Sequence, residues 1–154
     1  MTVLEAASVA GGGSSNLQGV TYTRLSHQHN PLTDFSLAGF GFATDHYETL
    51  LRDGALTADK DIGLGGYVQL HEADDTLAHL SEVLPLAPEF AQVLSAGEIA
   101  ALTGLKPRCG GIHYLRGGWL TPEAVCRALL AHPLISLQGD CAPLSLSRGQ
   151  AGGW

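Results

Sequence analysis

Apolar residues recur at helical spacing in one long stretch of the chain, residues 33–52. Asn30-Pro31 interrupts the chain just before this stretch and Gly54 follows it, as expected at the two ends of a helix. The apolar members are Phe35, Ala38, Phe42, Ala43, Tyr47, Leu50 and Leu51. The pattern predicts the longest helix of the chain here.

Two shorter helices are predicted in the middle of the chain. Asp74 or Asp75 can cap the first of them. Ser95 and Glu98 have the spacing of a capping box at the start of the second, and Gly104 ends it. Their apolar positions are Leu77, Leu80, Val83 and Leu84 in the first helix, and Ile99 and Leu102 in the second.

A fourth helix is predicted to begin after Thr121, with Pro122 at its first position and Glu123 in its first turn. It should run to about Ala131, because His132-Pro133 ends it. The residues predicted to be buried are Val125, Leu129 and Leu130.

Short apolar or alternating runs between the helices predict β-strands. The runs are residues 2–5, 65–70, 111–115, 134–137 and 144–147. A turn is predicted at Gly117-Gly118. Strands and helices mixed along the chain, with β-α order at both ends, indicate an α/β or α+β domain rather than a bundle or a sandwich.

The composition fits one globular domain. The chain has 154 residues, of which 45% are hydrophobic and 15% are charged, so it is not a disordered chain. No apolar run approaches the roughly 18 residues of a membrane span, and the N-terminus lacks the features of a signal peptide. We therefore expect a cytoplasmic protein with no membrane partner. The 20 glycines cluster in pairs, which indicates tight turns or backbone lying close to another group.

The charge and the potential metal-ligating residues argue against further classes of protein, namely nucleic-acid-binding and metal-binding proteins. Eight basic against fifteen acidic side chains give a net charge of −7, so any nucleic-acid partner must be held elsewhere. Cys109, Cys126 and Cys141 lie far apart in the sequence and are predicted to be small buried hydrophobes. His27 and His29 share a face if extended, but a third ligand is not evident nearby, so no metal site is predicted.

The N-terminal segment carries the most specific candidate chemistry. Glu5 ends the first predicted strand. In dinucleotide-binding folds an acidic residue at such a strand end accepts hydrogen bonds from the ribose hydroxyls. The alternative is that Glu5 lies in a solvated turn. The Gly-x-Gly-x-x-Gly loop expected about 20 residues earlier has no room ahead of Glu5. The loop from Gly12 to Gly19 joins consecutive glycines to hydroxyl and amide side chains, which can bind phosphate or a flavin edge. A flexible surface loop is its alternative. The segment does not match the pattern of a P-loop, because no Gly-Lys-Ser/Thr follows.

Residues 109–122 place a glycine pair on each side of a predicted strand, followed by Trp119 and a capped helix. This arrangement is typical of an edge that faces a ligand, whereas Trp119 alone is typical of a core. His113 lies in an apolar run and is predicted to be hydrogen-bonded scaffolding rather than a general base. Spacing alone assigns no catalytic triad, because triads are recognised by geometry.

Taken in order, these motifs resemble the FAD-dependent oxidoreductase part of the bifunctional tRNA 5-methylaminomethyl-2-thiouridine biosynthesis proteins. The resemblance covers nearly the whole chain. Its most specific pieces are the Gly-x-Ser-x-Asn-x-Gln-Gly loop at 12–19 and the Gly-Gly-Trp-Leu-x-Pro turn at 117–122. Further matching residues are Tyr22, Leu25-Ser26, Phe35, Phe42-Ala43, Tyr47 and Gly110-Gly111-Ile112-His113-Tyr114.

The resemblance implies a fold of the D-amino-acid-oxidase-like flavoproteins. The chain would be a mixed α/β (α+β) internal fragment: a partial Rossmann-type FAD-binding domain interleaved with part of an antiparallel substrate-domain sheet. Residues 1–60 would be the FAD-binding part without its first strand and glycine loop. Residues 61–118 would belong to the substrate domain, and residues 119–154 would return to the FAD-binding part.

The resemblance also implies a reaction and a set of site residues. The reaction is removal of the carboxymethyl group from carboxymethylaminomethyl-(2-thio)uridine at the tRNA wobble position, by FAD-dependent oxidation of the C–N bond and hydrolysis of the imine. A separate methyltransferase domain, which this chain does not supply, would then methylate the amine. The implied FAD-binding residues are Glu5, Gly12, Gly13, Ser14, Ser15, Asn16, Gln18 and Gly19. The implied substrate-side residues are Tyr114, Gly117, Gly118 and Trp119, and catalytic residues are not identified.

One residue departs from the family pattern: Ser15 stands where the family usually has Gly, which argues against a left-handed backbone there. Two alternatives to the tRNA-modifying enzyme stay open. One is a glycine- or sarcosine-type amine oxidase of the same superfamily. The other is a noncatalytic remnant, and we expect the isolated chain to bind no FAD because the pyrophosphate loop is missing.

Overall fold

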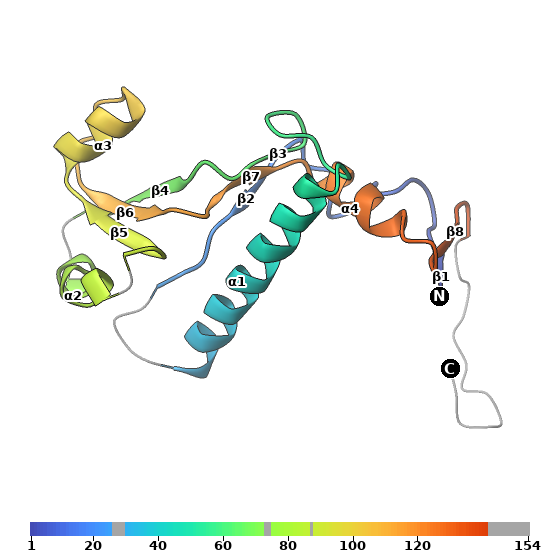
Figure 1. Cartoon of the computed structure of the whole chain (residues 1–154), viewed down its shortest axis with the longest axis horizontal. Coiled ribbons are helices and arrows are strands. Elements are labelled where there is room, and N and C mark those ends of the chain that lie inside the picture. The colour runs from blue at the N-terminus through green and yellow to red at the C-terminus, as the bar shows by residue number, and fades with distance from the viewer. Residues whose placement is uncertain (26–29, 73–74, 87, 142–154) are drawn as a thin grey trace.

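The computed structural model describes residues 1–25, 30–72, 75–86 and 88–141 (Figure 1). Strands and helices alternate along them, and none of these helices is long and apolar enough to cross a membrane. The strands are β1 (Thr2–Leu4), β2 (Gly19–Thr21), β3 (Ile62–Gly63), β4 (Tyr67–Leu70), β5 (Ala91–Leu94), β6 (Gly111–Tyr114), β7 (Gly118–Leu120) and β8 (Ser136–Gln138). The helices are α1 (Pro31–Arg52), α2 (Asp75–Val83), α3 (Ala96–Thr103) and α4 (Pro122–Leu130), with a 3-10 turn η1 at Leu84–Leu86.

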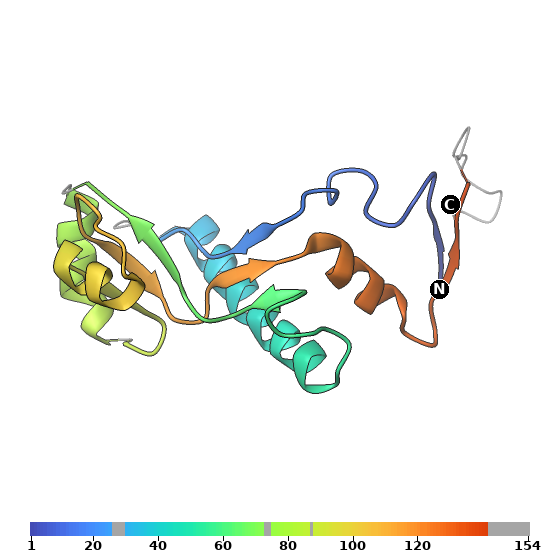
Figure 2. The ribbon, with the colours of Figure 1, turned by 90° about the horizontal axis from the view of Figure 1, so that it is seen from above.

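The strands form one parallel pair and two antiparallel sheets. β1 pairs in parallel with β8, so that Val3 lies opposite Leu137. β7 lies between β2 and β3, and β6 lies between β4 and β5, all antiparallel. In the view from above, β6 leads into β7, so the two antiparallel sheets follow one another while the β1–β8 pair lies at the other end (Figure 2). This mixed α/β architecture with parallel and antiparallel sheets confirms the predicted class.

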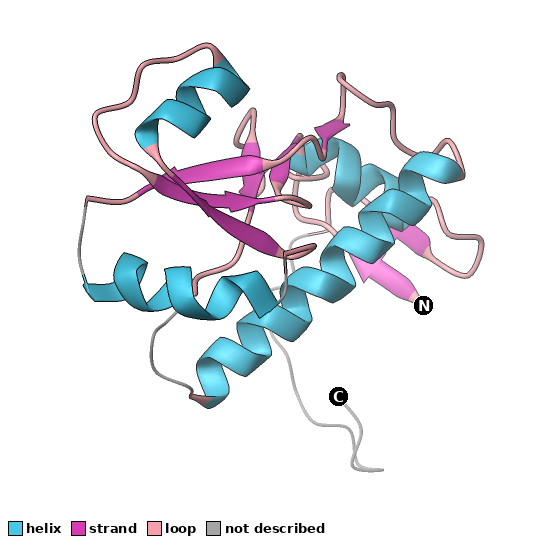
Figure 3. Cartoon of the chain, turned by 60° about the vertical axis from the view of Figure 1, so that its left-hand side comes forward, coloured by secondary structure: helices cyan, strands magenta, loops and turns pink. Residues whose placement is uncertain are grey.

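Two hydrophobic clusters hold these elements together. In the first, α2 packs on one face of the β4-β6-β5 sheet and buries Ile112 and Tyr114 (Figure 3). The second cluster forms where α1, β3 and α4 meet and contains Leu56, Ile62 and Val125. Alternation along β6 explains the first cluster, because residues two apart on a strand point to the same face.

The long helix α1 forms as the pattern predicts. The Asn30 side chain caps it by accepting a hydrogen bond from the Thr33 amide at 2.9 Å, and proline occupies the first helical turn. Phe40 is buried, whereas Phe35 and Phe42, which helped to predict the helix, are 77% and 76% exposed. The described elements cover one side of α1 and leave these two rings on the other.

The residues predicted to begin and end helices α3 and α4 are found at or close to those positions. Ser95 and Glu98 form the predicted capping box, and Gly104 adopts a left-handed φ of 72° after α3. α4 begins at the predicted position, but the side chain of Thr121 makes no capping hydrogen bond. Val125 is buried as predicted, while the prediction for Leu129 is wrong because its side chain is 44% exposed.

The structure corrects the predicted turn at Gly117-Gly118. The turn lies at Leu115–Arg116 instead, and Gly118 already pairs with Thr21 in β7. Strands β2, β3, β5 and β7 were not predicted. Asp74, the histidine pair at 27 and 29, and the strand predicted at 144–147 lie outside the described residues.

Candidate functional site

Glu5 and the glycine-rich loop line one cavity of about 250 Å³. The sequence pointed to these two features separately, and the fold brings them together. The lining residues are Val3, Glu5, Val9, Ala10, Gly12, Gly13, Ser14, Cys126, Leu130 and Leu137. The cavity thus has a carboxylate and glycine backbone on one part of its wall and the apolar side of α4 and β8 on another.

The parallel strand pair positions Glu5. Its amide donates to the Gln138 carbonyl at 2.9 Å, and its own carbonyl accepts from the Cys141 amide at 2.9 Å. One carboxylate oxygen, Oε1, accepts from the Ala7 amide at 3.1 Å. The backbone of Glu5 is therefore fixed at the end of β1, and Oε2 can accept further hydrogen bonds, such as those of two ribose hydroxyls.

The loop after Glu5 exposes its glycine backbone to open space. A Cβ atom built on Gly12 or Gly13 would meet nothing within 4 Å. The loop is held by local hydrogen bonds, including one of 3.1 Å from the Ser15 amide to the Gly12 carbonyl. The left-handed residue of the loop is Ala10, with φ 60°, and Ser15 is not left-handed. The expectation for Ser15 is thus confirmed, and the Ser15 side chain fits the backbone found there.

The remaining predicted cofactor residues lie elsewhere. Ser15, Asn16 and Gln18 are exposed and do not line the 250 Å³ cavity. Gly19 begins β2 and lines a second, larger cavity of about 510 Å³ between β2 and α1. The second cavity is lined by Gly19, Val20, Thr21, Tyr22, Thr23, Arg24, Ser36, Gly39, Phe40, Ala43, Tyr47 and Leu120. The loop therefore runs from one cavity to the other.

Tyr114, predicted on the substrate side, is part of the first hydrophobic cluster. Its side chain is 1% exposed and lies 6.2 Å from the ring of Tyr67 and 6.4 Å from that of Tyr22, centroid to centroid. Burial raises the pKa of Tyr114 to about 12, although a backbone hydrogen bond from Leu25 opposes this shift. The hydroxyl therefore stays protonated at neutral pH.

The three other substrate-side residues lie where two strands approach closely. A Cβ on Gly118 would overlap the carbonyl oxygen of Gly63, and one on Gly117 would come within 2.7 Å of the Tyr67 Cβ. The indole of Trp119 covers Gly63, with Nε1 only 2.5 Å from where a Cβ would be. Gly117 and Gly118 are thus required by packing, and a contact with substrate stays a prediction for all three.

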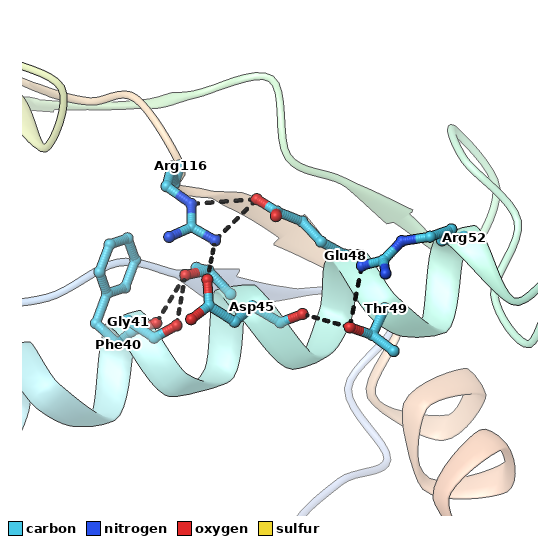
Figure 4. A network of polar contacts seen from close by, with 8 residues as sticks. Phe40, Gly41, Asp45, Glu48, Thr49, Arg52 and Arg116 are labelled. Atoms are coloured by element: carbon cyan, nitrogen blue, oxygen red, sulfur yellow. Dashed lines mark hydrogen bonds and ion pairs between the residues drawn. The ribbon is translucent and has the colours of Figure 1, made fainter.

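Sequence reasoning missed Arg116, which links the turn between β6 and β7 to α1 (Figure 4). Its guanidinium donates to Asp45 Oδ1 at 2.6 Å and to Glu48 Oε1 at 2.9 Å. These contacts raise the pKa of Arg116, with the hydrogen bond to Asp45 as the main cause. The i, i+3 spacing of Asp45 and Glu48 on a helix could have predicted the acidic pair, but not its partner 68 residues away.

Metal ligands do not gather in the described part of the chain: it contains no group of three or more His, Cys, Asp or Glu side chains placed to hold an ion. His113 lies in β6 and is half-buried. Its ring covers the glycine of a neighbouring loop, since a Cβ on Gly66 would overlap Nε2. The three cysteines are partly buried and free of disulfides, so the expected full burial is not seen.

Comparisons with known proteins converge on one family. The family described as "FAD dependent oxidoreductase" matches residues 1–136. The "tRNA 5-methylaminomethyl-2-thiouridine biosynthesis bifunctional protein MnmC" of Aeromonas hydrophila subsp. hydrophila is 32% identical over 151 residues, 94% of this chain and 22% of that protein. The protein of the same name from Legionella pneumophila (strain Corby) is 32% identical over 89% of this chain and 20% of its own length. The chain thus spans about a fifth of the length of these relatives.

Solved structures share the fold at lower sequence identity. Glycine oxidase from Geobacillus kaustophilus matches 90% of this chain and 40% of its own, with a TM-score of 0.64 and 17% identity. NikD, described as an unusual amino acid oxidase essential for nikkomycin biosynthesis, matches 90% of this chain and 36% of its own, with a TM-score of 0.57 and 17% identity. At this identity the likeness concerns the fold alone.

Proposed function

Because the chain belongs to the FAD dependent oxidoreductase family, we propose that it supplies part of the FAD-binding site and part of the substrate domain of a tRNA-modifying flavoenzyme. The observation that carries this proposal is the cavity in which Glu5 and the Gly12–Ser14 backbone meet. Residues 1–60 and 119–154 would form the cofactor part, and residues 61–118 the substrate part. The pairing of β1 with β8 supports this division, because it joins the two cofactor segments.

The residues of the cavity fit the adenosine end of FAD. Glu5 would accept hydrogen bonds from the ribose hydroxyls, and the open backbone at Gly12 and Gly13 would lie against the phosphates. Cys126, Leu130 and Leu137 provide the apolar wall that an adenine ring requires. Ser15, Asn16, Gln18 and Gly19 continue along the loop towards β2, where the flavin end would lie. FAD, when bound, supplies the hydride acceptor for oxidation of a C–N bond.

The substrate would be carboxymethylaminomethyl-(2-thio)uridine in tRNA. Loss of its carboxymethyl group and one methylation would give the methylaminomethyl group that the relatives' name refers to. The substrate-side residues would be Tyr114, Gly117, Gly118 and Trp119. Their common role would be to shape the sheet that faces the cofactor part, since two of them are glycines at a close strand contact. tRNA and a methyltransferase domain would be the partners of the complete protein.

Two measurements on the complete protein that carries this chain test the proposal. The purified protein should show the absorbance of bound flavin, and Glu5→Gln should weaken FAD binding roughly tenfold, the equivalent of one charge-assisted hydrogen bond. Glu82→Gln is the matched control, because Glu82 is exposed on α2. Mass spectrometry of treated tRNA should show loss of the carboxymethyl group. A colourless protein, or equal FAD affinity of both variants, would contradict the proposal.

A glycine-type amine oxidase is the second candidate, favoured by the structural likeness to glycine oxidase. It predicts peroxide production from free glycine or sarcosine. The tRNA-modifying enzyme should instead leave these amino acids unchanged while acting on the modified tRNA.

A further inference from the structure

Six residues of α1 lie on the side of the helix that faces away from the sheets. They follow one another at alternating intervals of three and four residues, which places them on one face of a helix. The six residues, which we call the outer stripe, are Leu32, Phe35, Gly39, Phe42, His46 and Thr49. Figure 1 shows β2 and β7 on the opposite side of α1, where Phe40 is buried. The described structure therefore leaves the large side chains of the outer stripe uncovered.

The exposed area of the outer stripe is close to what a small dimer interface needs. Leu32 is 73%, Phe35 77% and Phe42 76% exposed. Because a covered aromatic side chain buries roughly 150–250 Å², these three side chains offer about 350–500 Å² of apolar surface in each chain. Two copies would bury about 700–1,000 Å² between them, at the lower end of specific interfaces. This area fits a weak dimer with a Kd in the micromolar range.

The outer stripe is complementary to itself when two copies of α1 run antiparallel. Phe42 of each copy then faces Gly39 of the other, so that the large side chain fills the space that the glycine leaves. Phe35 faces His46 of the other copy, whose imidazole already stacks on Phe42 of its own helix with 7° between the ring planes. In a parallel pair, by contrast, Gly39 would face Gly39 and leave a gap.

Gly39 supports the antiparallel register. Glycine inside a helix is less stable than alanine. A Cβ at Gly39 would meet nothing within 4 Å, so the packing of the chain itself does not require a glycine here. The approach of a second helix does require one, because a side chain at this position would occupy the space that Phe42 of the other copy enters.

The charges of α1 favour a protein partner over a membrane surface. Helices that lie on membranes are usually rich in Lys and Arg. In α1 the acidic residues are Asp34, Asp45 and Glu48, and the single basic residue among Lys and Arg is Arg52. Two of these carboxylates already bind Arg116 of their own chain. The apolar stripe is therefore suited to another apolar stripe rather than to an anionic lipid surface.

We propose that the outer stripe of α1 is a dimer interface, on which α1 of a second copy of this chain packs antiparallel around a two-fold axis. Such an interface is isologous, because both copies use the same patch and each contact occurs twice. Gly39 also lines the larger cavity, whereas Phe35 and Phe42 line neither of the two cavities. Substitution of Phe42 therefore leaves the proposed FAD site intact.

Sedimentation of the complete protein between about 1 and 100 μM tests the dimer. The original protein should pass from monomer to dimer, and Phe42→Glu should weaken the dimer at least about hundredfold while keeping its flavin. Leu102→Glu is the matched control, because Leu102 is 54% exposed on another helix, α3. A protein that stays monomeric over the whole range, or a dimer unaffected by Phe42→Glu, would overturn the proposal. So would a monomer in which Phe42→Glu lowers the free energy of unfolding, because another part of the complete protein would then cover the stripe.

The variant Gly39→Ala separates dimer formation from the stability of the single chain. Where the protein is monomeric, the added methyl group should raise the urea concentration at half-unfolding, because alanine favours the helix and the space is free. The same methyl group should weaken the dimer about three- to tenfold, because it enters the space of Phe42 of the other copy. Unchanged dimer affinity would overturn the register.

Disulfide formation between copies tests the antiparallel direction. In this register Leu32 faces Thr49 of the other copy, whereas the two copies of Leu32 lie about 25 Å apart. A mixture of the Leu32→Cys and Thr49→Cys proteins should therefore form crosslinked dimers under mild oxidation, and neither variant alone should. The original protein sets the background, because Cys109, Cys126 and Cys141 are free. A mixture that does not crosslink, or either variant crosslinking alone, would overturn the antiparallel arrangement.

Discussion

The two ends of the molecule bury their apolar side chains to very different degrees. In the β4-β6-β5 sheet, Ile112 and Tyr114 are each 1% exposed beneath α2. In the β1–β8 pair, Leu4 is 55% and Leu137 is 41% exposed. An antiparallel sheet needs a cover on one face, which α2 supplies, whereas parallel strands are normally covered on both faces. The antiparallel end is thus complete within the described residues, and the parallel end is not.

Helix α1 shows the same difference around its own axis. Phe40 and Thr44 are buried against the rest of the chain, while Phe35 and Phe42 are exposed on the other side. A helix that is apolar on most of its circumference is normally buried all round. The side of α1 with Phe35 therefore resembles the parallel pair, since both present apolar surface without a cover in the described structure.

The largest difference in the free energy of unfolding is expected when one apolar side chain is truncated at each end of the molecule. Ile112→Ala should lower the free energy of unfolding by about 4 kcal/mol, because it leaves a cavity in the closed cluster. Leu137→Ala should lower it by less than about 1 kcal/mol, because that side chain is already partly in water. Urea unfolding of the chain measures both. Equal losses would show that the parallel end is as well packed as the antiparallel one.

A smaller effect is expected from adding one methyl group to a glycine in each region. Gly118→Ala should cost about 2–3 kcal/mol, because its Cβ would overlap the Gly63 carbonyl oxygen between β7 and β3. Gly12→Ala should change stability by less than about 0.5 kcal/mol, since open space surrounds that position. The same unfolding assay compares them. A large loss for Gly12→Ala would mean that the loop is packed rather than open to a cofactor.

Sequence patterns predicted the elements whose signals are local. The break at Asn30-Pro31 ahead of α1, the capping box at Ser95 and Glu98, and the end of α3 at Gly104 each depend on neighbours within four residues. Strands β4 and β6 were found through alternation or apolar runs. Glu5 and the glycine loop were predicted separately, each as part of a cofactor site. In the folded chain both line one cavity.

The missed features depend on residues far apart in sequence. β3 contains two residues and forms because β7 offers its backbone, so no periodicity can reveal it. The turn was predicted at Gly117-Gly118 but lies at Leu115–Arg116. Gly118 instead belongs to β7, where its lack of a side chain lets the strand approach the Gly63 carbonyl. Arg116 pairs with α1 across a separation of 68 residues. Leu129 was predicted to be buried because it is apolar, but α4 is covered on one side in the described structure.

The smallest expected effect concerns the hydroxyl of Tyr114 and the pH range above 10. The pKa of Tyr114 is raised to about 12 in the folded chain, above the value near 10 of an exposed tyrosine. The folded state therefore keeps this proton while the unfolded state loses it, so this contribution to stability is complete below pH 10 and is lost as pH rises from 10 to 12. Tyr114→Phe removes the titrating group, and at pH 8 should cost about 1 kcal/mol through the lost hydrogen bond with Leu25.

Urea unfolding at pH 8 and pH 11 measures this contribution as a difference between the two chains. The original chain should lose about 1 kcal/mol more than Tyr114→Phe between the two pH values, because at pH 11 the unfolded tyrosine is mostly ionised. Tyr22→Phe is the control, because its ring lies 6.4 Å from that of Tyr114. If Tyr114→Phe lost as much stability as the original chain, the hydroxyl would have to lie in contact with water. The closed antiparallel end would then be open at its centre, and its contrast with the parallel end would not hold.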